Sequence, residues 1–137
     1  MKRPFLLDTC AAIWFMEAAL PKSTVEALTE ALNQGRPTYV SPITAWEAGN
    51  LARKRRFKAS LAPSRWFGRL LAAPGMALSD MPPEVLIEST ELPGFPNNDP
   101  VDRIVAATAR EYGFTVVTRD RPLLDYGKQG YLNVLEC

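Results

Sequence analysis

Short apolar segments alternate with longer helical patterns along this sequence, and this alternation constrains the fold more than any other feature. The apolar segments predict strands at residues 5–7, 38–40, 76–78, 114–117 and 132–135. The helical patterns lie at residues 10–19, 24–33, 43–56, 63–72, 83–91 and 100–112. Alternation of this kind is typical of an α/β domain. We therefore expect a mainly parallel sheet of four or five strands with helices on both faces.

Length and composition agree with one ordinary folded domain over residues 1–137. Of the 137 residues, 47% are apolar and 23% are charged, and a chain of this kind can bury a substantial core. Sixteen basic and fifteen acidic residues give a net charge of +1, so the overall charge predicts no particular partner. Five of the six residues from 53 to 58 are basic, and any anion-binding surface must be local in this way.

The residue types that are absent limit the possible chemistry. Histidine is absent, which excludes His-dependent catalytic triads, histidine general bases and imidazole metal ligands in this chain. Cys10 and Cys137 lie at opposite ends of the sequence, without the spacing of a zinc site or a disulfide framework, and this indicates a reducing compartment. The basic start is interrupted by Asp8, and no apolar stretch reaches the roughly 18 residues that cross a bilayer. We therefore expect a cytoplasmic protein without a membrane segment.

Two aspartates follow predicted strands. Asp8 ends the apolar segment at residues 5–7, and Asp120 follows the segment that ends at Thr118 after a single arginine. In a parallel sheet, ligands collect beyond the carboxyl ends of the strands, so both carboxylates are expected at that edge. Aspartate also favours the start of a helix, where it accepts backbone hydrogen bonds, and helix capping is the alternative explanation for each residue.

Asp99 and Asp102 form a D-P-x-D motif at the start of the helix expected at residues 100–112. Asp99 occupies the capping position, Pro100 the first helical position and Asp102 the third. The positive end of the helix dipole favours a carboxylate here by about 0.3–1 kcal/mol. The motif by itself therefore fits a stable helix start as well as a functional pair of acids.

Glu47 is less easily explained by local stability. It shares a helical stripe with Ile43 and Leu51, so it is expected on the inward face of its helix. It also lies six residues after Ser41, the expected helix cap, which is too far for a capping box. Either Glu47 bends to the rim or pairs with an arginine, or it points inward and shares a site with other acids.

Several carboxylates in one cleft need a compensating charge. At ~4 Å and an effective dielectric constant of ~20, each pair of carboxylates repels by about 4 kcal/mol. A divalent cation removes this cost. Mg²⁺ and Mn²⁺ prefer oxygen ligands and keep several water molecules, so they suit a set of carboxylates in a histidine-free chain better than zinc or copper does. Metal-bound water is then a nucleophile at neutral pH.

Three separated segments resemble a known family. They are LLDTCAAIW, SPITAWEAGNLARKRRF and NDPVDRIVAATAREYGFTVVTRD. Together they look like the signature segments of PIN-domain ribonucleases, and they most resemble VapC-type toxins of bacterial toxin–antitoxin pairs. The resemblance covers nearly the whole chain and keeps the order of the segments. It implies a PIN-like three-layer α/β/α sandwich.

The resemblance assigns site residues by position in these segments. The family's first acid, followed by a small hydroxyl residue, matches Asp8 with Thr9, and its second acid matches Glu47 within AWEAGNL. The third and fourth acids match Asp102 of DRIVAATA and Asp120 of VVTRD. The resemblance implies that these four acids are catalytic and hold the metal, with two auxiliary residues, Thr9 and Asp99.

By the same resemblance, the protein is expected to be a Mg²⁺- or Mn²⁺-dependent endoribonuclease and the toxin of a toxin–antitoxin pair. Its partners would be an RNA substrate, a small antitoxin with a DNA-binding domain, and a second copy of itself in a homodimer. The expected reaction is in-line attack on phosphorus by metal-activated water, which leaves a 3′-hydroxyl and a 5′-phosphate. The alternative is a catalytically silent PIN-like module that binds RNA or a protein. Aspartyl-phosphate enzymes are excluded because Cys10 occupies the place of their second aspartate.

Further residues remain open from the sequence. The basic run at residues 53–58 either contacts RNA or complements the carboxyl end of a helix. Trp14, Trp46 and Trp66 fall at apolar helical positions, so we expect them in the core or a dimer interface rather than stacked on bases. Arg103 and Arg119 each flank an acid and steady either a carboxylate or a phosphate.

Overall fold

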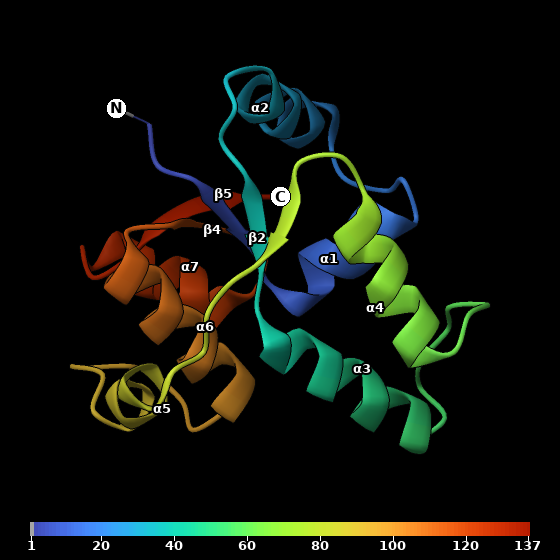
Figure 1. Ribbon diagram of the computed structural model, residues 1–137. Coiled ribbons are helices and arrows are strands. Elements are labelled where there is room, and N and C mark those ends of the chain that lie inside the picture. The colour runs from blue at the N-terminus through green and yellow to red at the C-terminus, as the bar shows by residue number, and fades with distance from the viewer. Residues whose placement is uncertain (1) are drawn as a thin grey trace.

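Five short strands form one sheet at the centre of the computed structural model, which describes residues 2–137 (Figure 1). The strands are β1 (Phe5–Leu7), β2 (Thr38–Val40), β3 (Met76–Leu78), β4 (Thr115–Thr118) and β5 (Asn133–Glu136). Their order is β3-β2-β1-β4-β5, and every neighbouring pair is parallel. The chain therefore leaves β1 toward β2 on one side and returns to β4 on the other. Open parallel sheets bind ligands beyond the carboxyl ends of the strands at such a switch point.

Seven helices of the described residues form two layers on the sheet. They are α1 (Thr9–Met16), α2 (Lys22–Asn33), α3 (Pro42–Arg53), α4 (Pro63–Ala72), α5 (Pro83–Thr90), α6 (Pro100–Tyr112) and α7 (Arg121–Lys128). Helices α1 to α4 lie on one side of the sheet and α5, α6 and α7 on the other (Figure 1), and each layer buries its apolar residues against its own face of the sheet. The expected three-layer α/β/α sandwich is confirmed. In this range, no helix combines the length and apolar character that would cross a membrane.

The central strand shows why both faces of the sheet must be covered. Successive side chains of a strand point to opposite faces. Leu6 packs into the cluster with α5, α6 and α7, whereas Leu7 packs into the cluster with α1 to α4, and both are fully buried. A strand that is apolar on both faces is typical of a parallel sheet between helices.

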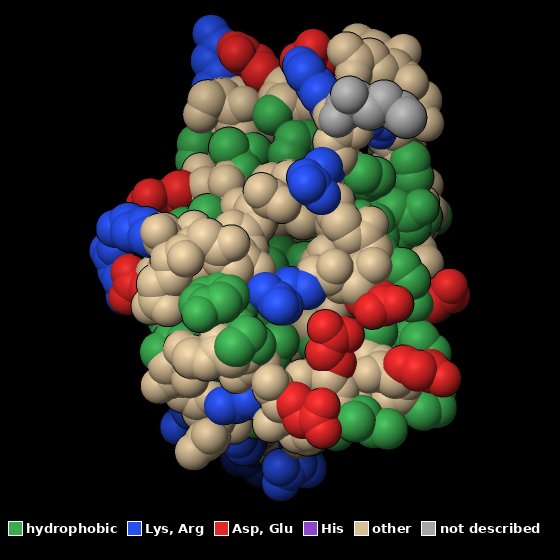
Figure 2. All heavy atoms as spheres, turned by 90° about the vertical axis from the view of Figure 1, so that its left-hand side faces the viewer, with side chains coloured by type: hydrophobic (Ala, Val, Ile, Leu, Met, Phe, Trp, Pro, Cys, Tyr) green, Lys and Arg blue, Asp and Glu red, His purple; other side chains and the backbone are tan. Residues whose placement is uncertain are grey.

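Figure 2 views the outer face of the layer formed by α5, α6 and α7. Acidic side chains gather over one part of this face, at the lower right of the view, and apolar side chains lie between them. The exposed residues Leu86 and Ile87 of α5 contribute apolar surface to this layer. This acidic region is poorly suited to a polyanion, so a nucleic-acid surface is better sought elsewhere.

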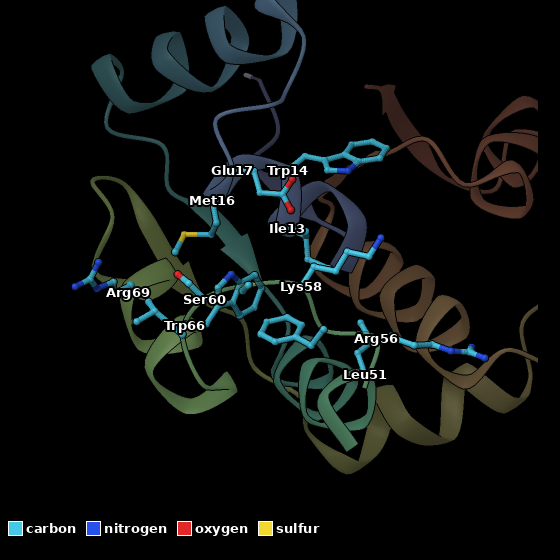
Figure 3. A pocket seen from close by; sticks show the side chains of 13 residues that line it. Ile13, Trp14, Met16, Glu17, Leu51, Arg56, Lys58, Ser60, Trp66 and Arg69 are labelled. Atoms are coloured by element: carbon cyan, nitrogen blue, oxygen red, sulfur yellow. The ribbon is translucent and has the colours of Figure 1, made fainter. Parts of the chain in front are cut away.

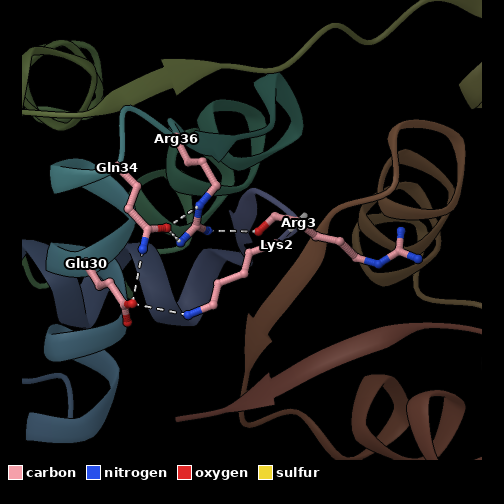
Figure 4. Close-up of polar contacts among 5 residues, drawn as sticks. All are labelled: Lys2, Arg3, Glu30, Gln34 and Arg36. Atoms are coloured by element: carbon pink, nitrogen blue, oxygen red, sulfur yellow. Dashed lines mark hydrogen bonds and ion pairs between the residues drawn. The ribbon is translucent and has the colours of Figure 1, made fainter.

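The segment before β1 is tied to α2 and to the turn that follows it (Figure 4). Lys2 Nζ donates to Glu30 at 3.1 Å, and Gln34 Nε2 donates to the same carboxylate oxygen. Arg36 donates to the Gln34 side-chain oxygen and to the carbonyl of Arg3. The Lys2 and Glu30 side chains are 63% and 54% exposed, so their pair contributes at most about 1 kcal/mol. This network lies at the amino ends of the strands, on the opposite edge from the acids described below.

Several element boundaries differ from the sequence-based expectation. The helix expected at residues 10–19 ends at Met16, because Ala18 has a positive φ of 54°. The helix expected at residues 43–56 ends at Arg53, and Arg55 has a φ of 58°. The last two strands each lie one residue later than expected. Helix α7 was not predicted at all, since Pro122 and Gly127 within it are typical of loops.

Candidate active site

Asp8 follows β1 directly and caps α1. Its Oδ1 accepts a hydrogen bond from the backbone N–H of Ala11 at 2.7 Å, and its Oδ2 accepts one from the Thr118 hydroxyl. The capping explanation is therefore right for Asp8, but one oxygen also faces the end of β4. Only 3% of Asp8 is exposed, and this burial raises the pKa of its carboxyl to about 6, with smaller contributions from Asp120 and Glu47. The two hydrogen bonds lower the pKa but do not offset burial.

Thr118 links the ends of β1 and β4. Parallel pairing of Leu7 with Val117 places the residues that follow, Asp8 and Thr118, side by side. The fully buried Thr118 hydroxyl donates to Asp8 and accepts from the backbone N–H of Asp120 at 3.0 Å. Asp120 begins α7, yet its side chain makes no capping hydrogen bond. The capping explanation is therefore wrong for the Asp120 side chain, whose carboxylate stays available, with a pKa raised by burial and by Asp99.

Glu47 lies on α3 and is half-buried, as expected for an inward-facing residue. Burial raises the pKa of its carboxyl, the Thr9 hydroxyl lowers it, and Asp99 and Asp120 raise it further. Thr9 is itself buried, and its hydroxyl lies 3.2 Å from the hydroxyl of Thr44, one turn before Glu47. The alternative of a pair with an arginine is not found among residues 2–137. Glu47 thus faces the same region as the strand-end acids.

Asp99 and Asp102 play different parts at the start of α6. Asp99 is exposed, and its Oδ1 accepts from the backbone N–H groups of Val101 at 2.9 Å and Asp102 at 3.4 Å, so it caps the helix. Asp102 is half-buried, and Asn97 Nδ2 donates to its Oδ2 at 3.4 Å. Burial raises the pKa of Asp102 to about 7, and Asp99 and Asp120 raise it further while Asn97 lowers it.

The half-buried Cys10 indicates how the acids are arranged. Burial raises the pKa of its thiol to about 12, and the carboxylates that raise it further are those of Asp120, Asp8, Glu47 and Asp102. All four predicted acids therefore act on one side chain at the carboxyl edge of the sheet. The thiol stays protonated at neutral pH and is no candidate nucleophile.

The acids form no close ion pair. Across residues 2–137, Lys2 with Glu30 is the one ion pair within 4 Å, and Lys54 lowers the pKa of Glu47 only from beyond that distance. In the same range, no three His, Cys, Asp or Glu side chains stand close enough together to enclose a metal ion. The acids are held by separate anchors, Asp8 by Thr118 and Asp102 by Asn97. Because Mg²⁺ needs only one or two carboxylates and keeps several waters, this all-oxygen set of donors fits such an ion.

A groove of about 750 Å³ lies between α1, α3 and α4, and none of the four acids is among the residues that line it (Figure 3). Apolar residues including Ile13, Leu51 and Trp66 line it, as do three cations, Arg56, Lys58 and Arg69, of which Arg56 and Arg69 point outward on opposite sides in Figure 3. Since α3 ends at Arg53, most of the basic run at residues 53–58 belongs to the connection after the helix. Two cations of this run, Arg56 and Lys58, line the groove, so the run does more than complement the carboxyl end of α3.

The two flanking arginines and the three tryptophans differ in their surroundings. Arg103 donates to the backbone carbonyls of Asn97 and Ser89, so it fixes the loop before α6. The guanidinium of Arg119 lies over the ring of Trp14. Trp66 is 3% exposed and belongs to the core as expected, whereas Trp46 is 55% exposed and does not. Thr118 and Asn97, which hold two of the acids, were not singled out from the sequence, although each lies within a few residues of an acid.

This parallel sheet, with four acids at its carboxyl edge, belongs to a defined class. The family model of the PIN domain matches residues 5–129, and the chain belongs to this family. Ribonuclease VapC22 of Mycobacterium tuberculosis (strain ATCC 25618 / H37Rv) is 30% identical over 118 residues, which cover 86% of this chain and 88% of that protein. The resemblance to VapC-type PIN ribonucleases is thereby confirmed.

Solved structures share the fold. A chain of DNA-bound VapBC from Salmonella typhimurium superposes with a TM-score of 0.68 at 22% identity, covering 98% of both chains. A chain of VapBC2 from Rickettsia felis, bound to a DNA fragment from its promoter, has a TM-score of 0.69 at 14% identity and covers 96% of this chain and 97% of that one. A chain of FitAB bound to an IR36 DNA fragment has a TM-score of 0.58 at 20% identity, with 96% and 94% covered.

Proposed function

We propose that this protein is a Mg²⁺- or Mn²⁺-dependent endoribonuclease, folded as a single domain over residues 1–137, that acts as the toxin of a toxin–antitoxin pair. The observation that supports the proposal is that Asp8, Glu47, Asp102 and Asp120 lie near enough to the carboxyl edge of the sheet for all four to raise the pKa of the Cys10 thiol, with no Lys or Arg nitrogen of residues 2–137 within 4 Å of any of them. Uncompensated carboxylates are costly in a partly buried site, and a divalent cation removes that cost. Membership of the PIN family and the relation to Ribonuclease VapC22 support RNA as the substrate.

Asp8, Glu47, Asp102 and Asp120 would hold the metal in this proposal. When bound, the ion supplies a Lewis acid that lowers the pKa of a water molecule and offsets charge on the phosphate. Thr118 keeps the Asp8 carboxylate in one orientation. Thr9 beside Glu47 and Asp99 at the start of α6 are auxiliary, since they position neighbouring groups.

The proposed reaction is hydrolysis of a phosphodiester bond. A water oxygen attacks phosphorus, the bond from phosphorus to the 3′-oxygen breaks, and the products carry a 3′-hydroxyl and a 5′-phosphate. In a chain without histidine, the proton of the attacking water passes to a carboxylate, to Thr9 or to solvent, and the departing 3′-oxygen takes up a proton from solvent. Without metal, burial raises the pKa of Asp8 to about 6 and that of Asp102 to about 7, so both carboxyl groups would lose their protons as they take up the cation.

The proposed partners follow from the comparisons. Structural relatives of this fold come from VapBC and FitAB complexes bound to DNA. We infer that a small antitoxin with a DNA-binding domain binds this protein and inhibits it in the cytoplasm. A homodimer is the proposed state of the free toxin, in keeping with the family.

Metal-dependent cleavage tests the proposal. A single-stranded RNA with labels at both ends is incubated with the protein in Mn²⁺, in Mg²⁺ and in EDTA, and the ends of the products are mapped. We expect cleavage only with the metals, a 5′-phosphate on the downstream product, and loss of cleavage in Glu47→Gln. Glu26→Gln, an exposed acid of α2, is the matched control and should cleave normally. RNA binding without cleavage, unchanged by EDTA and by Glu47→Gln, would show a non-catalytic module instead.

A further inference from the structure

In the sequence, Arg119 lies between two residues of the candidate active site. It follows Thr118, whose hydroxyl donates to Asp8, and precedes Asp120. Its side chain turns away from both neighbours, since no ion pair joins it to any carboxylate of residues 2–137. Arg119 therefore does not serve to neutralise the acids between which it lies.

Two contacts hold the Arg119 side chain. Its guanidinium carbon lies 3.5 Å from the centre of the Trp14 ring, which is the distance of a stacked cation–π pair. Its Nε donates to the backbone carbonyl of Cys137 at 3.1 Å. An exposed arginine ordinarily keeps about 2 kcal/mol of rotamer entropy. Here much of that freedom is already lost before any ligand binds, so the guanidinium is preorganised.

The outer edge of the same guanidinium has no partner in the described chain. Nε makes the one hydrogen bond recorded for this side chain, and neither terminal nitrogen donates to an atom of residues 2–137. Arg119 is exposed, so the free edge is accessible. A planar fork of donors with this geometry matches two oxygens of a phosphate.

Trp14 connects Arg119 to the groove between α1, α3 and α4. Its side chain is among those that line the groove (Figure 3), and the guanidinium of Arg119 lies over its ring. The charged residues of the groove are Arg56, Lys58 and Arg69, with Glu17 as the one acid. The excess of positive charge suits a strand of phosphates. Arg119 is linked to the groove through Trp14 and to the acids through its neighbours in the chain, Thr118, which donates to Asp8, and Asp120.

We propose that Arg119, held flat on Trp14, binds a phosphate of single-stranded RNA next to the scissile one, and so positions the strand that enters the acid cluster from the groove. Arg119 is a positioning residue and takes no part in bond breaking. The inference rests on the proposed ribonuclease function, because it identifies how that site takes its substrate. A protein contact at this place is the competing possibility and is an outcome of the test.

Binding of RNA without cleavage isolates this role. A fluorescent single-stranded RNA is titrated with wild-type protein, Arg119→Gln, Arg119→Lys and Arg65→Gln in EDTA, over a series of salt concentrations. Arg65 is an exposed arginine of α4 that does not line the groove, so Arg65→Gln is the matched loss of one positive charge. Thermal unfolding of each variant checks that the fold is retained.

We expect Arg119→Gln to bind the RNA about tenfold more weakly, as for loss of one charge-assisted phosphate contact. The slope of log K against log salt should fall by about 0.7, the value for one phosphate of a single strand. Arg119→Lys should restore the slope but recover only part of the affinity, because lysine lacks the fork. Arg65→Gln should match the wild type in both. A role confined to the Cys137 contact would change the unfolding temperature and leave the salt slope unchanged.

The failures of the two proposals are distinguishable. If wild-type protein cleaves RNA with Mn²⁺ but Arg119→Gln keeps the wild-type slope and affinity, the inference is overturned and the ribonuclease function stands. If the wild type binds RNA with the Arg119-dependent slope and never cleaves it, the inference stands and the ribonuclease function fails. If Arg119→Gln binds RNA normally but loses binding of a purified antitoxin, Arg119 makes a protein contact and the inference is wrong. If Arg119→Gln does not fold, the affinity of Arg119→Lys decides: weaker binding at an unchanged salt slope supports the inference, and wild-type affinity overturns it.

Discussion

The buried carboxylate of Asp8 should make the metal-free protein less stable at high pH, and Asp8→Asn should remove this effect. The pKa of Asp8 is raised from 3.8 to about 6, so the folded state holds the proton more tightly than the unfolded state does. Stability therefore carries no penalty from Asp8 below about pH 4 and falls as the pH rises through 3.8 toward 6. Asparagine is neutral at every pH and can still accept from Ala11 and contact Thr118.

The size of the effect follows from the shift. About two pKa units at about 1.4 kcal/mol each give an upper limit of about 3 kcal/mol above pH 7. A chain of this length gains roughly 3–4 °C in unfolding temperature for each kcal/mol, so the variant should unfold about 10 °C higher than wild type at pH 8. At pH 4 the two proteins should unfold within about 2 °C of each other, since Asp8 is then largely protonated.

The assay is thermal unfolding in EDTA between pH 4 and pH 8, followed by circular dichroism. The pKa values of Asp102, Glu47 and Asp120 are also raised, but these residues are the same in both proteins. The difference in unfolding temperature between wild type and Asp8→Asn therefore isolates Asp8. Asp80→Asn changes an exposed aspartate and is the control, so its unfolding temperature should match that of the wild type at every pH. The reasoning is refuted if Asp8→Asn is destabilised to the same degree at pH 4 and at pH 8.

Three further predictions concern the residues around the acids. Thr118→Val removes the hydroxyl that joins Asp8 to the Asp120 backbone, so kcat/KM for RNA cleavage should fall by about 10- to 100-fold, whereas Thr118→Ser should stay near wild type. Equal activities of Thr118→Val and Thr118→Ser would contradict this role. Asp99→Ala should lower the free energy of unfolding, measured by urea denaturation, by about 1 kcal/mol because the α6 cap is lost, and Asp99→Asn should lower it by much less. Equal losses in the two variants would show that the charge of Asp99, and not its capping hydrogen bonds, stabilises the fold. Gly127→Ala places a methyl carbon 2.7 Å from Val134 Cγ2, so the free energy of unfolding in urea should fall by about 1–3 kcal/mol. An unchanged urea midpoint would show that β5 moves aside freely.

The positions of the acids could be predicted because they depend on local pattern and sheet topology. Asp8 and Asp120 follow strands, and parallel strands end at one edge of the sheet, so no tertiary detail is needed to bring them near each other. The inward direction of Glu47 followed from its spacing to Ile43 and Leu51. The parallel direction of the strands also followed, since helices between strands require parallel crossovers, whereas their order did not.

The residues that hold the acids could not be predicted in the same way. Thr118 meets Asp8 across 110 positions of sequence, and this contact depends on the register of β1 against β4. The stacking of Arg119 on Trp14 depends on the packing of α1 over the end of β4. Helix α7 escaped prediction because its proline and glycine suggest a loop, whereas Leu123, Leu124 and Tyr126 bury one face of it. Tertiary burial therefore outweighs local propensity there.

Binding of Mn²⁺ to the purified protein tests the central claim most directly. Isothermal titration calorimetry at about pH 7.5 compares wild type with Asp8→Asn, Asp102→Asn and the control Asp80→Asn. We predict that wild type and Asp80→Asn bind Mn²⁺ alike, and that each of the other two variants loses more affinity than the roughly 10- to 100-fold typical of a residue that only supports a ligand. Equal Mn²⁺ affinity in all four proteins, or no binding by the wild type, would contradict a metal-dependent site at the carboxyl edge of this sheet.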